Sequence, residues 1–157
     1  MTQVRKSPRL LGVLLSAAAV VSCSKSSPTE PVLDLDSVTI VSIQPPAGTV
    51  LQAGARVTFT ATIGYHLVNA SSGSVFIVVQ DQALKNLSST VPVPSVNVVR
   101  GTGTVGLSDS VVIPAAGVTS VGVFFPLLQT GATVTQTVQS VSYTVVPAPG
   151  AASPRVR

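Results

Sequence analysis

The sequence predicts an all-β protein, and three observations lead to this class. Val and Thr are abundant, and their β-branched side chains suit pleated strands better than helices. Apolar and polar residues alternate with a period of two in several short runs after residue 37. Turn-forming Gly, Pro, Asn and Ser separate these runs, and no stretch after Cys23 has helical periodicity. Together these features favour a sandwich or a barrel.

The clearest strand is residues 56–65, in which every second residue is apolar and would face a core. These apolar residues are Val57, Phe59, Ala61, Ile63 and Tyr65. A second strand is expected at residues 120–125, with Val121, Val123 and Phe125 facing inward. Further strands are expected at 38–43, 74–79, 104–113 and 135–146, and a short edge strand at 96–99.

Local signals also predict turns and one irregularity. Turns are expected at 45–48, 53–54, 69–73, 92–94, 114–117 and 130–131, where Pro, Gly, Asn and Ser cluster. Within residues 135–146 the apolar phase changes between Val138 and Val141. We therefore expect a β-bulge near Gln139 and Ser140.

The first 22 residues have the zones of an export signal. A basic start is followed by an uncharged apolar run of 12 residues, 10–21. Because a membrane-spanning helix needs about 20 apolar residues, this run is too short to span a bilayer stably. The pattern is typical of a secretory signal peptide.

The end of that run, Val20-Val21-Ser22-Cys23, resembles the bacterial lipobox. The resemblance implies a lipid on the sulfur of Cys23, cleavage before it, and a membrane anchor at the cell envelope. Cys23 is the only cysteine of the chain, so lipidation would account for an otherwise leftover thiol. In lipoproteins of bacteria with two membranes, an Asp directly after the lipidated cysteine favours retention at the inner membrane. Ser24 occupies that position here, so the resemblance implies the outer membrane. The alternatives are an ordinary signal peptide with an incidental cysteine, or an anchor that is not cleaved.

The domain organisation follows from these patterns. We expect a signal peptide at 1–22, a lipidated cysteine with a Ser/Pro-rich tether at 23–36, a β domain at 37–146 and a disordered tail at 147–157. The β domain is close to the roughly 100 residues of an immunoglobulin-like sandwich.

A family resemblance supports this domain. The run from Ile43 to Leu51, the Ala53-Gly54 pair and the alternation over 57–63 look like the first two strands of bacterial Ig-like or fibronectin-III-like domains. The resemblance implies a single antiparallel β-sandwich of about seven strands. The Trp and the paired cysteines of antibody-type domains are absent. A small β-barrel is the alternative fold.

Candidate chemical motifs are few. Residues 101–106 match G-x-G-x-x-G, but a strand-like run follows them and no acid occurs after Asp109. We therefore expect a Gly/Thr-rich turn and no dinucleotide site. His66, the only histidine, is expected in a loop or at an edge. A catalytic triad would have to combine His66 with Asp81 or Asp109 and a freely chosen serine, because G-x-S-x-G is absent.

Asp34 and Asp36 are two carboxylates, too few alone for calcium, and they are expected at a solvated start of the first strand. The sequence therefore predicts no catalytic, cofactor-binding or metal-binding residue. Lipidation of Cys23 is the one predicted site.

The charged residues of the chain bear on its possible partners. The net charge is +4, yet residues 32–150 hold three cations and four acids, a net charge of −1, so no nucleic-acid partner is expected. The prediction is a non-catalytic, lipid-anchored envelope protein that serves as an interaction or structural module, with the membrane and an envelope protein or glycan as partners. A carbohydrate or small-ligand binder, which needs an aromatic groove, and an envelope enzyme are the alternatives.

The outer faces of the expected strands carry few charged side chains. Because charged side chains protect a strand edge from pairing, their scarcity would allow edge-to-edge association or the addition of a strand by a partner. The simpler explanation is that the strands are rich in Thr and have no such role.

Overall fold

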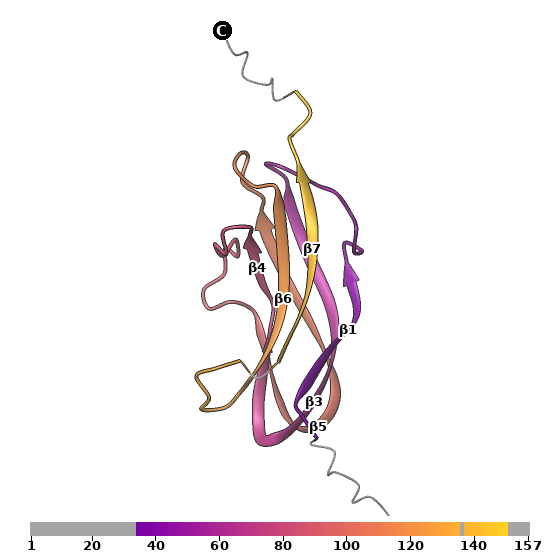
Figure 1. The fold of residues 1–157 in the computed structure, drawn as a ribbon, viewed down its shortest axis with the longest axis vertical. Coiled ribbons are helices and arrows are strands. Elements are labelled where there is room, and N and C mark those ends of the chain that lie inside the picture. Colours follow the sequence, from indigo (N-terminus) through magenta and orange to yellow (C-terminus); the bar gives the residue numbers. More distant parts are fainter. Residues whose placement is uncertain (1–33, 136, 151–157) are drawn as a thin grey trace, which may run out of the picture. The chain divides into compact units, whose positions relative to one another are not determined.

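The computed structural model describes residues 34–135 and 137–150 (Figure 1). Their elements are β1 (Ser37–Gln44), β2 (Leu51–Gln52), β3 (Arg56–Phe76), β4 (Val78–Asp81), β5 (Ser95–Val112), β6 (Ser120–Gln129) and β7 (Thr137–Val146). These residues form no helix. The predicted fold class, a single Ig-like antiparallel β-sandwich of about seven strands, is confirmed.

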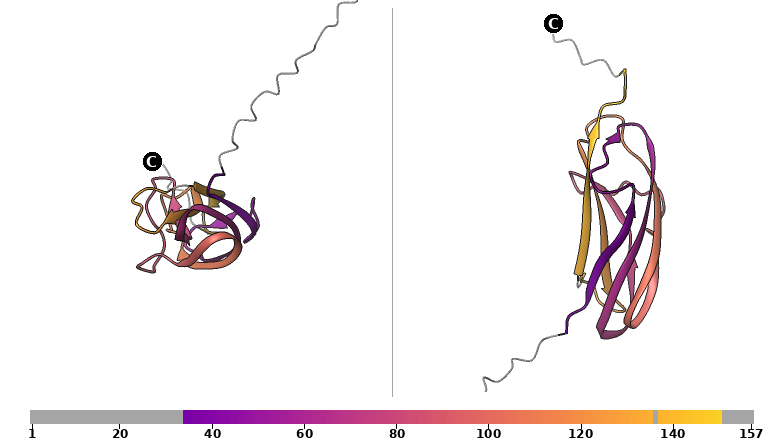
Figure 2. Two further views of the ribbon diagram at one scale, coloured as in Figure 1. Left: turned by 90° about the horizontal axis from the view of Figure 1, so that it is seen from below. Right: turned by 90° about the vertical axis from the view of Figure 1, so that its right-hand side faces the viewer.

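The strands form two layers, and the long strands β3 and β5 take part in both. In the first layer, residues 56–67 of β3 pair antiparallel with β5, and β1 pairs with β3 from the other side. In the second layer, β6 pairs antiparallel with β4, with β7 and with residues 73–75 of β3. The short β2 pairs with the end of β7 in parallel. The right-hand view of Figure 2 shows β7 on one side and β3 with β5 on the other.

A bulge in β3 marks the place where the chain passes from one layer to the other. The β3–β5 register moves from Leu67 opposite Gly101 to Ser72 opposite Val99. Four residues of β3, 68–71, therefore face Arg100 alone. Gly101 has a φ of +118°, a conformation that glycine adopts without steric cost.

Two sequence predictions fail at this crossing. The turn expected at 69–73 is wrong, because these polar residues continue β3 through its bulge. The Gly/Thr-rich turn expected at 101–106 is also wrong, since these residues lie inside β5. Strands 96–99 and 104–113 are consequently one strand. Gly103 fits a strand here because the Tyr65 ring occupies the space beside it, where a Cβ would lie 2.8 Å from the ring.

The bulge expected near Gln139 is wrong as well. The β6–β7 ladder runs from Ser120 opposite Thr144 to Leu127 opposite Thr137 without a register shift. Val138 projects from the outer face and is 49% exposed. The apparent change of phase therefore came from one exposed apolar side chain, not from an extra residue.

The core lies between the layers and follows the predicted alternation. Phe59, Ala61 and Ile63 of β3 are buried, as are Val121, Val123 and Phe125 of β6, whereas Val57 and Tyr65 are half-buried. The rings of Phe59 and Tyr143 meet across the layers, with centroids 5.3 Å apart. The Tyr143 hydroxyl donates to the Pro45 carbonyl at 2.7 Å, and burial raises the pKa of this phenol. The Tyr143 ring is therefore packed in the core, and its hydroxyl still has a hydrogen-bond acceptor.

Candidate functional site

The predicted lipidation site, Cys23, lies outside the described residues, as do the signal peptide and most of the tether. The described chain starts at Asp34, at the end of the domain where β1 begins. The last strand, β7, ends at the opposite end (Figure 1). A tether before Asp34 is thus joined to one end of the sandwich.

Asp36 organises the polar cluster at that end. Its Oδ1 accepts hydrogen bonds from the backbone N–H groups of Val68 and Asn69 at 2.8 and 3.0 Å, and from the Asn69 side chain at 3.2 Å. Its Oδ2 accepts a bond of 2.6 Å from the Gln129 side chain. One carboxylate thus joins the start of β1, the bulge of β3 and the end of β6.

These contacts change the acidity of Asp36. Burial by itself raises the pKa of this carboxyl, but the bonds from Val68, Gln129 and Asn69 stabilise the anion and hold the pKa below its ordinary value. The predicted solvated start of the first strand is therefore incomplete, because Asp36 serves as an acceptor for the bulge. The sequence carried no signal for this, since Gln129 is 93 residues away.

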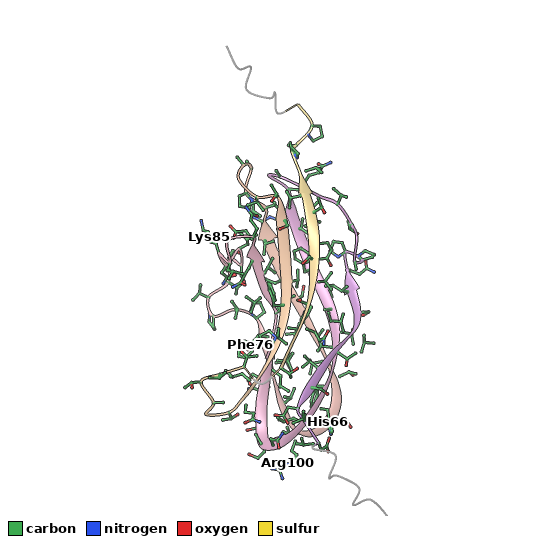
Figure 3. The ribbon with its side chains drawn as sticks, in the orientation of Figure 1. His66, Phe76, Lys85 and Arg100 are labelled. Carbon is green, nitrogen blue, oxygen red and sulfur yellow. The ribbon has the colours of Figure 1, made fainter. Side chains whose placement is uncertain are left out.

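His66 lies in an interior stretch of β3, between Ser37 of β1 and Thr102 of β5. The expectation of a loop or edge position is therefore wrong. Its Nδ1 is 3.5 Å from Oδ1 of Asp34, and the two side chains are 33% and 68% exposed. Figure 3 shows His66 and Arg100 at the end where β1 begins, and Lys85 toward the other end.

Asp109 is the one charged side chain among the buried residues of the described chain. It is 3% exposed and lies in β5 opposite Phe59, between Leu107 and Val111. Neither carboxylate oxygen has a hydrogen-bond partner among the described residues. Along the β3–β5 ladder Asp109 and His66 are seven rungs apart, about 23 Å, so they cannot exchange a proton directly.

The described residues form no cluster of metal ligands, and the pocket beside the 130–132 turn has no aromatic lining. Among residues 34–135 and 137–150, no three His, Cys, Asp or Glu side chains are grouped to hold a metal ion. No helix in this part of the chain is long and apolar enough to cross a membrane. A pocket of about 500 Å³ lies between the 130–132 turn, β3, β5 and the end of β6. Its lining combines hydroxyl, amide and small side chains with Val98, Val99 and Leu128, and has no aromatic ring to stack on a sugar.

The outer faces of the two layers differ. On the first layer the outer face carries hydroxyls, and two cross-strand pairs touch: Thr58 with Ser110 at 2.7 Å and Thr60 with Ser108 at 3.3 Å. On the second layer, three successive outward positions of β6 are apolar: Phe124, Pro126 and Leu128. They and their neighbours are half-buried: Phe76, Val78, Phe124, Pro126 and Leu128. The sequence held one signal for this, because adjacent Phe124 and Phe125 cannot both face inward from a strand.

The chain matches no protein-family model and no curated protein. Among solved structures it is similar to the CARDB domain of a Pyrococcus furiosus protein in complex with di-metal ions. That similarity has a TM-score of 0.45 and 11% identity, over 73% of this chain and 96% of the other. It is also similar to a family 2 glycosyl hydrolase from Bacteroides cellulosilyticus. There the TM-score is 0.41 and the identity 14%, over 69% of this chain and 13% of the hydrolase.

Proposed function

We propose that this chain is a non-catalytic module of the bacterial cell envelope, held by lipid on Cys23, that binds another protein through the edge of its sandwich. The N-terminal zones and the lipobox-like Val20–Cys23 segment support the anchor. The observation that carries the binding role is the edge of β5. From residue 95 to 109 this strand pairs with β3 on one side and with no described strand on the other.

An open edge is a binding surface because its free N–H and C=O groups can accept a further strand. The opposite edge of the same layer is less suitable. There, the β1 register shifts between Ile40 and Ser42, leaving Val41 as a bulge that interrupts the edge. β5 continues without such a shift from residue 101 to 112.

The anchor is tested by the intact mass of membrane-extracted protein, wild type beside Cys23→Ala. We expect loss of residues 1–22 and added acyl mass in the wild type, and neither in the variant. An unmodified mass in the soluble fraction of the wild type would contradict the anchor.

The binding role is tested with a photo-crosslinking residue at Thr104, on the exposed face of β5, in cells that carry the full chain. Thr60 provides the matched control, since it is also an exposed threonine on the outer face of the first layer but lies in the interior strand β3. We expect covalent adducts from position 104 and few from position 60. Equal yields, or none from position 104, would contradict a role for this edge.

A further inference from the structure

This inference rests on the proposed binding role, which does not say which protein pairs with the β5 edge. The residues of that edge limit which partner can bind. Its usable part is residues 102–108. Beyond it, Ser88 forms a bridge with Val111, and the Ser89 hydroxyl donates to the Ser110 carbonyl. At the other end, Gly101 has a positive φ that bends the strand.

This stretch lacks the features that usually protect an edge. It holds no charge and no proline. The nearest cation, Arg100, is turned back onto its own domain, where its Nε donates to the Ala70 carbonyl at 3.1 Å. A second strand therefore meets no electrostatic barrier here.

The order of residues on this edge is complementary to itself. We infer that the partner is a second copy of this chain, whose β5 adds antiparallel to the first about a two-fold axis at Val105. In this register the two copies of Val105 face each other. On the outer face Thr104 lies opposite Gly106 of the second copy, so a larger residue meets a small one, and on the inner face Gly103 lies opposite Leu107.

The outer face of this stretch supports the same register. Thr102 faces Ser108 of the second copy, a pairing of hydroxyls like those that already join β3 to β5 at Thr58–Ser110 and Thr60–Ser108. The seven paired residues carry no charge, so no like charges are opposed. The two first layers become one six-stranded sheet in the order β1-β3-β5-β5-β3-β1.

The geometry also sets the strength and the orientation of the dimer. Seven paired residues span about 24 Å, so the interface is small and the dissociation constant lies in the micromolar range or above. Because the two β5 strands run in opposite directions, the two β1 strands begin at opposite ends of the dimer.

Sedimentation of the full chain with Cys23→Ala, over concentrations up to about 1 mM, tests the dimer. We expect a reversible monomer–dimer equilibrium in which Thr104→Lys weakens association roughly tenfold, since the two lysines lie on the same face beside the axis. Thr58→Lys adds the same charge on the outer face of the interior strand β3, opposite Ser110 and outside the paired stretch, and should leave the equilibrium unchanged. A monomer at all concentrations, or a dimer that Thr104→Lys does not weaken, would overturn the inference.

Disulfide formation tests the register in the same Cys23→Ala background. Val105→Cys should form a disulfide with itself, because directly opposed residues bring their Cα atoms within about 5.5 Å. Thr102→Cys should not form one alone, since its two copies are about 20 Å apart, but should do so when mixed with Ser108→Cys. Failure of Val105→Cys to cross-link would overturn this pairing. If the probe at position 104 captures a different protein while the chain stays monomeric, the binding role stands and the inference of a second copy falls.

Discussion

Two aspartates of this domain have opposite surroundings, and the contrast shows what a carboxylate needs in a β-sandwich. Asp36 lies at the end of the domain and accepts four hydrogen bonds. Asp109 lies in the core, 3% exposed, and accepts none from the described residues. A hydrogen-bonded carboxylate stabilises the fold, whereas burying one without donors costs free energy.

The difference follows from where each side chain stands relative to the backbone. The bulge of β3 frees the N–H groups of Val68 and Asn69 from the ladder and turns them toward Asp36. Around Asp109 the ladder is regular, with Phe59 opposite, so its side chain projects into the core while the neighbouring N–H groups lie in the plane of the sheet, out of its reach. An irregular backbone therefore provides donors that a regular strand does not.

Asp36→Ala is expected to have the largest effect. Removing the carboxylate leaves the two backbone N–H groups of the bulge without an acceptor, so the free energy of unfolding should fall by about 3 kcal/mol. Urea unfolding followed by circular dichroism measures it. Asp36→Asn is the matched control: its side-chain oxygen can still accept, and it should lose less than half as much. Equal losses for the two variants would mean that the charge, not the number of acceptors, matters.

Asp109→Val should act in the opposite direction. It replaces a buried carboxylate by an apolar side chain that suits a strand, and we expect the free energy of unfolding to rise by about 2 kcal/mol. Asp109→Asn keeps the shape and the polarity and should give a smaller rise. If Asp109→Val lowers the stability instead, then this carboxylate has a partner in solution and the contrast with Asp36 fails.

The comparison of the two aspartates also shows which structural features the sequence alone could predict. The strict alternation at residues 56–65 was sufficient to place Phe59 and Ile63 in the core, because period two has only one interpretation in a half-buried strand. The polar run at 69–73 is wrongly predicted as a turn, because Asn, Ser and Gly occur both in turns and in bulges. Only the pairing with Val99 and Gly101, distant in sequence, decides between them. The donors of Asp36 depend on that pairing, so they were not within reach of local patterns. Asp109 differs, because period two within the expected strand 104–113 already puts it on the same face as Leu107 and Val111.

Acid should reduce the contribution of Asp36 without reaching the effect of its removal. The folded pKa of this carboxyl is below its value in the unfolded chain, so its contribution is complete above the ordinary value of 3.8 and is lost as the pH falls through the folded pKa. Unfolding of the wild type and of Asp36→Asn, from neutral pH to below 3.8, should show the difference between them narrowing. A difference that stays constant with pH would show that protonation of Asp36 is not linked to folding.

Asp34→Ala should have the smallest effect, although Asp34 is only two residues from Asp36 in the same Asp-Leu-Asp segment. Its side chain is 68% exposed and its carboxylate touches His66 at 3.5 Å, a geometry in which water screens most of the attraction. We expect the free energy of unfolding to change by less than about 0.5 kcal/mol. The measurement is urea unfolding at neutral pH beside Asp36→Ala. A loss comparable to that of Asp36→Ala would mean that the contact between His66 and Asp34 secures the start of β1, so that the position of the carboxylate, and not its donors, separates the two aspartates.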